Sequence, residues 1–304
     1  MSTAGFSHAV VGVTDLEEAM DLWVNTFGLA IFDQRIGPDE ALSDMWGLPE
    51  DEIAAQALVG IEGSFLGRVH LVQFAHPGPV VRANAVAYDL CPKNLDLRVR
   101  DLHQRYEELV QAGWALGSAP VRLALEGEVY EVHLKGPDAM NYSLVEVVGS
   151  DLPYTEHGYL AVTQFVATTS NNIAESEFFG DVFGLSPISH HVLEGPEIES
   201  MIGLPPGTKL DMRILGHPDQ PLGAVELVEY VGVIGNDLYP TTSPPARGFL
   251  GVSFSVDDLD GVAFRAVEAG SKVIDIGTLA TITGSGRRLR ITSPSGLQIE
   301  LVQS

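Results

Sequence analysis

The chain has 304 residues, and its 41 Asp and Glu against 17 Lys and Arg give a formal net charge of −24. Such a surface repels phosphate backbones and anionic lipids, which argues against nucleic acid or a membrane as a partner. The apolar content of 45% argues against disorder, and the N-terminus MSTAGFSHAV lacks the pattern of a secretory signal. We therefore expect a cytoplasmic protein. Its one cysteine, Cys91, can form neither an internal disulfide nor a zinc cluster.

The sequence contains a long repeat. Residues 5–29, GFSHAVVGVTDLEEAMDLWVNTFGL, return in altered form at 161–185 as AVTQFVATTSNNIAESEFFGDVFGL, an offset of 156. GRVHLVQF at 67–74 returns at the same offset as GAVELVEY at 223–230. NLDLRVRDL at 94–102 returns at an offset of 157 as GVSFSVDDL at 251–259. Such a steady offset predicts two related domains, 1–150 and 151–304.

The first unit begins with a predicted strand at 7–14. Asp15 is a candidate N-cap because acidic residues follow it in the first helical turn, and apolar residues then recur at helical spacing until Gly28. A loop-rich excursion at 38–53 contains a short helix. Further strands are predicted at 30–36, 54–62 and 67–75. The unit is therefore β-α-β-β-β.

Three more units follow. The proline-containing connector 76–92 leads to a second unit with a strand at 94–100 and a helix from Asp101 to Ala112. Residues 149–158 link the two halves. The third unit spans 159–230, and the fourth spans 249–303. The predicted fold class is α+β, built from four copies of one small unit.

The unit openings and the terminal segment SPSGLQIEL at 293–301 resemble the vicinal oxygen chelate superfamily. That superfamily includes glyoxalases, methylmalonyl-CoA epimerases, fosfomycin-resistance enzymes, bleomycin-binding proteins and extradiol dioxygenases. The resemblance covers nearly the whole chain and implies that two units curl into each cupped mixed sheet, with metal ligands on the first and last strands of each unit. These motifs specify a fold more closely than a reaction.

Carried onto the first half, the resemblance gives four positions, His8, His70, Asn94 and Glu146. Two imidazoles and a carboxylate are a set that holds ferrous iron or another divalent ion while leaving coordination positions open. We expect His8, His70 and Glu146 to bind the metal, with Asn94 as a fourth ligand or a substrate contact. The set departs from extradiol dioxygenases, whose two histidines resemble the positions of His8 and Asn94.

His133 lies four residues before Pro137, where extradiol enzymes usually carry a tyrosine near the metal. An imidazole titrates near neutral pH, so His133 is a candidate general acid or base. The alternative is a surface histidine on an edge strand. Glu146 is a second candidate base.

The matching positions of the second half are Gln164, Glu226, Gly251 and Glu300. They resemble a glyoxalase-type set of Gln, Glu, His and Glu in which Gly251 replaces the histidine. Because glycine offers no donor, we expect the second half to be degenerate, with at most a weak site for a hard ion at Gln164, Glu226 and Glu300.

The resemblance implies a metal-dependent enzyme that chelates two neighbouring oxygens of a small organic substrate and stabilises the negative charge that develops on it. The two-histidine set favours a ring-cleaving dioxygenase with Fe(II), while Mn, Ni, Co and Zn are the other candidate metals. A glyoxalase- or epimerase-like lyase or isomerase is an alternative. A metal-free protein that binds an antibiotic or aromatic ligand is another. Two halves of one chain, or two chains of a homodimer, would close the cup.

Overall fold

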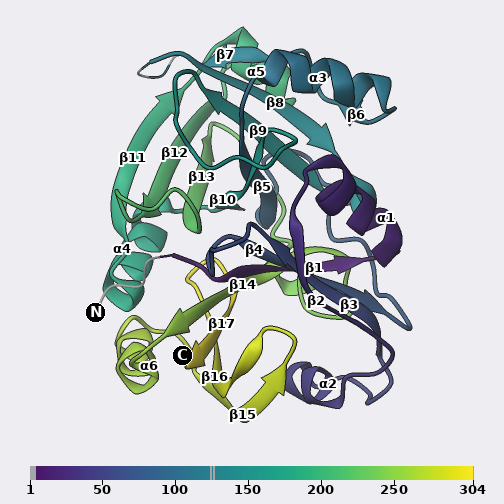
Figure 1. Ribbon diagram of the computed structural model, residues 1–304. Coiled ribbons are helices and arrows are strands. Elements are labelled where there is room, and N and C mark those ends of the chain that lie inside the picture. The colour runs from purple at the N-terminus through teal and green to yellow at the C-terminus, as the bar shows by residue number, and fades with distance from the viewer. Residues whose placement is uncertain (1–4, 124, 126, 304) are drawn as a thin grey trace.

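The computed structural model describes residues 5–123, 125 and 127–303, and its strands form two curled mixed sheets (Figure 1). The predicted α+β class and the vicinal oxygen chelate architecture are confirmed. The first unit comprises β1 (His8–Val13), α1 (Leu16–Met20), η1 (Asp21–Thr26), β2 (Ala30–Ile36), α2 (Glu40–Trp46), β3 (Ile53–Gly60) and β4 (Arg68–Phe74). The second comprises β5 (Pro92–Val99), α3 (Leu102–Gln111), β6 (Ala115–Leu116), β7 (Val121–Leu123), β8 (Val129–Lys135), η2 (Pro137–Ala139) and β9 (Asn141–Val147).

The second half repeats this order. The third unit comprises β10 (Tyr159–Thr168), α4 (Asn172–Phe183), β11 (Ser186–Leu193), α5 (Pro196–Ile202), β12 (Lys209–Gly216) and β13 (Ala224–Val231). After η3 (Tyr239–Thr241), the fourth unit comprises β14 (Gly248–Val256), α6 (Leu259–Glu268), β15 (Ile274–Thr281), β16 (Gly284–Thr292) and β17 (Gln298–Gln303). Among the described residues, no helix is long and apolar enough to cross a membrane.

Each sheet combines one unit from each half of the sequence. The first sheet has the order β15-β16-β17-β14-β1-β4-β3-β2 and joins the first unit to the fourth. The second sheet has the order β11-β12-β13-β10-β5-β9-β8-β6, with β7 paired to β8, and joins the second unit to the third. The expected domains 1–150 and 151–304 are the two copies of the repeat, and each copy contributes one unit to each sheet.

The first strands of the paired units meet at the centre of each sheet. In the first sheet β1 runs antiparallel to β14, with His8 opposite Ser253. In the second sheet β10 runs antiparallel to β5, with Gln164 opposite Asp96. Within each unit the first strand is parallel to the last. Side chains from four strands of two units therefore share the middle of one sheet face.

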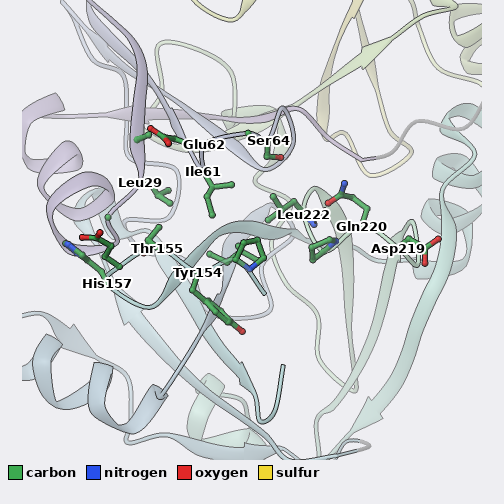
Figure 2. A pocket seen from close by; sticks show the side chains of 17 residues that line it. Leu29, Ile61, Glu62, Ser64, Tyr154, Thr155, His157, Asp219, Gln220 and Leu222 are labelled. Carbon is green, nitrogen blue, oxygen red and sulfur yellow. Dashed lines mark hydrogen bonds between the residues drawn. The ribbon is translucent and has the colours of Figure 1, made fainter. Parts of the chain in front are cut away.

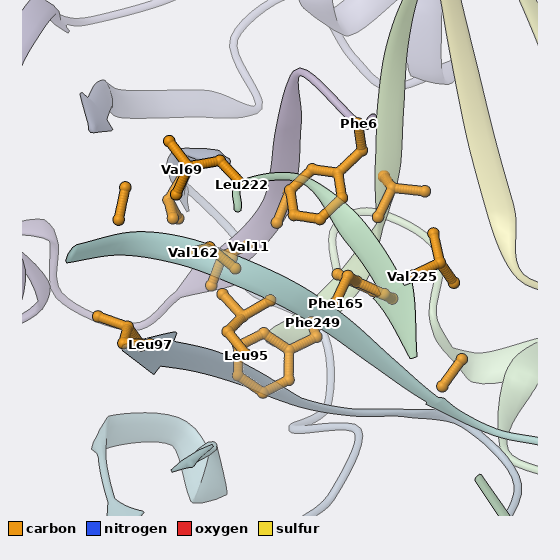
Figure 3. Packing of buried hydrophobic residues seen from close by; sticks show 14 of the residues in the cluster. Phe6, Val11, Val69, Leu95, Leu97, Val162, Phe165, Leu222, Val225 and Phe249 are labelled. Carbon is orange, nitrogen blue, oxygen red and sulfur yellow. The ribbon is translucent and has the colours of Figure 1, made fainter. Parts of the chain in front are cut away.

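One face of each sheet packs into a shared apolar core. Figure 3 shows Phe6 and Val11 of the first unit close to Leu95 and Phe165 of the second sheet, and the rings of Phe6 and Phe165 meet edge to face at 6.2 Å. Strand residues alternate between faces, so the neighbours of Leu95 and of the other core residues point to the opposite face. That opposite face carries the polar residues described below.

Side-chain caps fix where the helices begin. Asp15 accepts hydrogen bonds from the backbone N–H groups of Glu17 and Glu18, which confirms the predicted N-cap of α1. Asn171 and Asp258 cap α4 and α6 in the same way. The helix expected up to Gly28 is α-helical only to Met20 and continues as a π-helix.

A second capping group comes from the last strand of a unit. Gln73 accepts from the N–H of Leu16, and Glu229 accepts from the N–H of Asn172. Glu146 accepts from Asp101 N at 3.1 Å and from Leu102 N at 3.0 Å. The position recurs in three units and joins the start of each helix to its sheet.

Replacing Glu146 by Ala removes the cap of α3, because the Asp101 side chain makes no capping hydrogen bond. We expect a loss of about 1 kcal/mol in the free energy of unfolding, measured by urea denaturation. Glu107→Ala on the exposed side of α3 is the control, with an expected change below about 0.5 kcal/mol. Equal effects of the two changes would contradict the capping role.

Candidate functional site

Among the described residues, the hollows large enough for an organic ligand include two of about 900 and 510 Å³. The larger, about 900 Å³, lies between the linker residues 153–157, the β3–β4 turn and the loop before β13. His157 and Asp219 lie at opposite ends of it (Figure 2). His157 Nδ1 contacts the carbonyl of Thr26, and Thr155 donates to the carbonyl of Phe27. These groups hold the linker in place and do not converge on a ligand.

The other hollow is a cavity of about 510 Å³ on the polar face of the second sheet. This is within the size range of small-molecule sites, about 300–1,000 Å³. Asn94, His133, Gln164 and Glu226, four of the residues singled out in the sequence, all line it. Four charged residues that sequence reasoning missed join them, namely Lys93, Asp96, Arg98 and Glu131.

Strand pairing explains why these side chains converge. Gln164 in β10 lies opposite Asp96 in β5, which lies beside Ser143 in β9, and Ser143 lies opposite His133 in β8. Val166 in the next row separates Asn94 from Glu226. One row across four strands and its neighbour therefore hold the cluster, which draws on both halves of the sequence.

The amide side chain of Asn94 is held in a fixed orientation. Its Nδ2 donates to Asp96 Oδ1 at 2.8 Å and to Ser143 Oγ at 2.7 Å. Its Oδ1 is buried and has no hydrogen-bond partner among the described residues. A buried acceptor without a partner is costly unless a ligand or a water molecule supplies one. Asn94 therefore offers a free oxygen in the site.

Burial, followed by the charge of Glu131, raises the pKa of Asp96 to about 7. Burial, followed by the neighbouring carboxylates of Asp96 and Glu131, raises the pKa of Glu226 well above its ordinary value. Two such acids side by side cannot both be ionised without a compensating cation. The nearby ammonium of Lys93 offsets part of this repulsion, and shared protons or a bound metal ion would offset the rest.

Glu131 and His133 form a close pair at the edge of this cluster. His133 Nε2 lies 2.8 Å from Glu131 Oε1. Burial opposes ionisation of Glu131, but the hydrogen bond from His133 and its charge outweigh it and lower the pKa of Glu131. A carboxylate that orients an imidazole is a common arrangement for proton transfer.

Lys93, which also lines the cavity, donates to the hydroxyl of Tyr230. Burial, followed by the charge of Arg82, lowers the pKa of Lys93 to about 8. One N–H donor of the ammonium group is thus used within the protein, and its charge still acts on Glu131 and Glu226.

The expected metal ligands His8 and His70 lie in the first sheet, and Glu300 belongs to the same face. The two imidazole rings are 5.9 Å apart, and Trp46 Nε1 donates to Glu300 Oε1 at 2.8 Å. Trp46 of α2 and its apolar neighbours cover this face, and the cavity beside Glu300 measures only about 30 Å³. That volume is too small for an organic substrate.

The first-sheet cluster also contains a buried guanidinium. Nε and Nη1 of Arg288, Nε2 of His8 and the hydroxyl of Ser253 lack hydrogen-bond partners in the described part of the chain. Burial, followed by the charge of His70, lowers the pKa of His8 well below its ordinary value. Burial, followed by the charge of Arg288, lowers the pKa of His70 to about 3. Both imidazoles are therefore neutral at pH 7.

The structure does not bring Glu146 together with His8 and His70. Glu146 lies in the second sheet and caps α3. The residue of β9 in the site row is Ser143, which is 157 positions before Glu300. The same offset relates Asp96 to Ser253, so Gly251 lies two residues from the site position, and a Cβ there would collide with the carbonyl of Gln298.

A consistent offset of 157 was the signal that could have found Asp96. Applied strictly, it pairs Asp96 with Ser253 and Ser143 with Glu300, one strand row for each sheet. Glu131 precedes His133 by two residues and so shares its strand face. Arg98 follows Asp96 by two residues in the same way. The alternation of side chains along a strand therefore places Asp96, Arg98 and Glu131 on the same polar face of the sheet.

In the described ranges, no three His, Cys, Asp or Glu side chains are arranged so that they could hold a metal ion by themselves. A metal ion in the cavity would depend on amide oxygens as well. Gln164 and Asn94 supply amide oxygens, and Asp96 and Glu226 supply carboxylates. Such oxygen donors fit a hard divalent cation, and the free Oδ1 of Asn94 is consistent with one.

The two curled sheets with polar centres have the vicinal oxygen chelate fold. Glyoxalase I from Zea mays is similar over 98% of this chain and 92% of its own, at 17% identity and a TM-score of 0.69. A point mutant of the same enzyme matches at 18% identity with the same coverage and TM-score. A suspected dioxygenase from Bacillus subtilis matches over 99% of this chain and 86% of its own, at 12% identity and a TM-score of 0.64. No family model and no curated protein matches the chain.

The buried neutral state of His70 predicts a dependence of stability on pH. Its pKa is about 3 in the folded protein against about 6.5 unfolded, so the unfolded chain binds more protons between these values. The contribution of His70 to the free energy of unfolding is fully present above about pH 6.5. It falls as the pH drops towards 3, by at most about 1.4 kcal/mol per pH unit.

The measurement is urea unfolding at pH 7.5, 6.5 and 5.5 for the wild type and His70→Gln. We expect the wild type to lose more stability than the variant between about pH 6.5 and 5.5, by about 1 kcal/mol. His103→Gln, at an exposed position of α3, should follow the wild type. Parallel curves for wild type and His70→Gln would show that His70 is not held neutral.

Proposed function

We propose that the chain is a metal-assisted enzyme that moves a carbon-bound proton next to a carbonyl or hydroxyl group, as glyoxalase- and epimerase-like lyases and isomerases do. The reaction centre is the cavity of the second sheet. The observation that carries this proposal is the convergence of Asp96, Glu131, Glu226 and His133 in a cavity of about 510 Å³. The likeness to glyoxalase I structures supports the choice of class.

Gln164, Glu226, Asp96 and Asn94 would hold a divalent ion. Oxygen ligands favour Mg²⁺ or Mn²⁺ over the ferrous iron expected from the two histidines. When bound, the ion would polarise a substrate oxygen and stabilise negative charge on it. With the divalent ion bound, Asp96 and Glu226 would both be ionised, because a nearby cation favours the charged form of a carboxyl group.

The Glu131–His133 pair moves the proton. Ionised Glu131 holds the imidazole through Nε2, which leaves Nδ1 as the atom that accepts a proton from the substrate and returns it. His133 and Glu131 both line the cavity. We therefore retain His133 as the candidate acid and base. Glu146 is no longer proposed as a base, because its carboxylate caps α3.

The geometry favours this function over a ring-cleaving dioxygenase. Two imidazoles and a carboxylate, His8, His70 and Glu300, do share one sheet face, but α2 and Trp46 cover it. The substrate-sized cavity lies in the other sheet, where the donors are oxygens. A metal-free binding protein has no need of two buried acids and an oriented imidazole in its ligand site, since buried unpaired carboxyls are costly.

Metal-binding measurements on two variants show whether the metal site lies in the first or the second sheet. We expect about one equivalent of Mn²⁺ to bind per chain, as measured by titration calorimetry and elemental analysis, and Glu226→Gln to weaken it at least tenfold. His70→Gln should bind as the wild type does. Loss of metal in His70→Gln with retention in Glu226→Gln would place the centre in the first sheet and overturn the assignment.

Proton transfer is detected by NMR as incorporation of deuterium from D₂O. The panel consists of 2-oxo acids, 2-hydroxy ketones and hemithioacetals, each with a hydrogen on the carbon next to the carbonyl. We expect exchange in the Mn²⁺-loaded protein, reduced at least a hundredfold in His133→Gln and at least tenfold in Glu131→Gln.

The matched control is Glu128→Gln, because the Glu128 carboxylate accepts a hydrogen bond from the exposed hydroxyl of Tyr130 and does not line the cavity; this variant should exchange at the wild-type rate. No exchange in any compound, together with oxygen uptake on a catechol panel by the iron-loaded protein, would favour the dioxygenase. Neither activity, with ligand binding unchanged by metal removal, would favour the binding protein.

A further inference from the structure

Arg98 is a cation of the proposed site without a hydrogen-bond or ion-pair partner in the described part of the chain. It lies in β5, two residues after Asp96 on the same strand face, and it lines the cavity half-buried. Its guanidinium forms no hydrogen bond and no ion pair with any residue that the structure describes. A half-buried arginine with five free N–H donors is prepared for an external acceptor.

Other cations around the cavity have partners within the protein. Lys93 donates to the hydroxyl of Tyr230, and Arg213 pairs with Asp211 at 3.3 Å. Arg82 donates to Cys91 and to the carbonyl of Val86. Arg98 interacts electrostatically with the carboxylates of Asp96, Glu131 and Glu226, but none of them lies within ion-pair distance of it.

The charge of the cavity leaves room for one anion. Asp96, Glu131 and Glu226 contribute three negative charges when a divalent ion is bound. Counted without His133, the opposing positive charges are four, from Lys93, Arg98 and the divalent ion. A monoanionic substrate would balance the remaining charge, and a neutral one would leave a buried positive charge uncompensated.

The walls of the cavity are apolar on both sides of this polar floor. Leu123, Val129 and Val147 form one side, and Leu193, Met201 and Met212 form the other. These surfaces fit a hydrocarbon or aromatic body, which gains about 25 cal/mol per Å² of apolar surface buried. A small polar metabolite would leave them exposed to water.

We propose that Arg98 binds the carboxylate of the substrate, which is a carboxylic acid with an apolar body and an oxygen on the carbon next to the carboxylate. Residues two apart on a strand are separated by roughly 7 Å. A carboxylate on Arg98 therefore places its neighbouring oxygen beside Asp96 and Gln164. The proposal rests on the proposed function for the role of those residues, and its test reads binding separately from turnover.

The experiment compares two probes by titration calorimetry on the Mn²⁺-loaded full chain. 2-Oxo-4-phenylbutyrate carries the carboxylate, the neighbouring oxygen and the apolar body, and 4-phenylbutan-2-one has a methyl group in place of the carboxylate. We expect the acid to bind at least tenfold more tightly than the ketone. Arg98→Met should weaken the acid at least tenfold and leave the ketone unchanged, while Arg98→Lys should bind the acid with intermediate affinity.

Arg122→Met, at an exposed position of β7 outside the cavity, should bind both probes as the wild type does. Circular dichroism and thermal unfolding establish that each variant is folded. Equal binding of acid and ketone, equal weakening of both by Arg98→Met, or no binding of the acid would overturn the proposal. Binding of the acid through Arg98 without deuterium exchange would overturn the proposed reaction alone, and exchange that is indifferent to Arg98 would overturn this inference alone.

Discussion

Antiparallel pairing between the first strands of two units organises the whole molecule. A single β-α-β-β-β unit has an unpaired edge along its first strand, and β1 satisfies it with β14 while β10 satisfies it with β5. This pairing completes each sheet and buries one face of both sheets in a shared core (Figure 3). It also sets His8 opposite Ser253 and Gln164 opposite Asp96. Each polar centre is thus a direct consequence of how two units join.

The same scaffold carries two centres with opposite electrostatics. In the first sheet the neutral imidazoles of His8 and His70 lie near the buried guanidinium of Arg288, under the cover of Trp46. In the second sheet three carboxyls gather in an open cavity, where desolvation and mutual repulsion raise the pKa of Asp96 and Glu226. Burying like charges costs free energy unless a cation or protons compensate. The second centre therefore has the stronger physical reason to bind a metal ion and a ligand.

The helix caps explain which part of the site could be predicted from sequence. Gln73, Glu146 and Glu229 each join a helix to the last strand of its unit, and this recurring position lies three residues after the site position. An acidic residue on the last strand therefore has two possible roles at nearly the same place in the repeat. Asn94, Gln164, Glu226 and His133, which the sequence analysis singled out, line one cavity, although the sequence analysis divided them between two expected domains.

The four units, most of their strands and helices and the N-cap at Asp15 could be predicted from sequence alone, because hydrophobic period and capping act over a few residues. The choice of which units share a sheet depends on tertiary packing. Any first strand of the repeat offers similar backbone donors and acceptors, so local pattern does not select its partner. The shared core and the connectors make that choice, which separates His8 and His70 from Glu146 and unites Asp96 and His133 with Gln164 and Glu226.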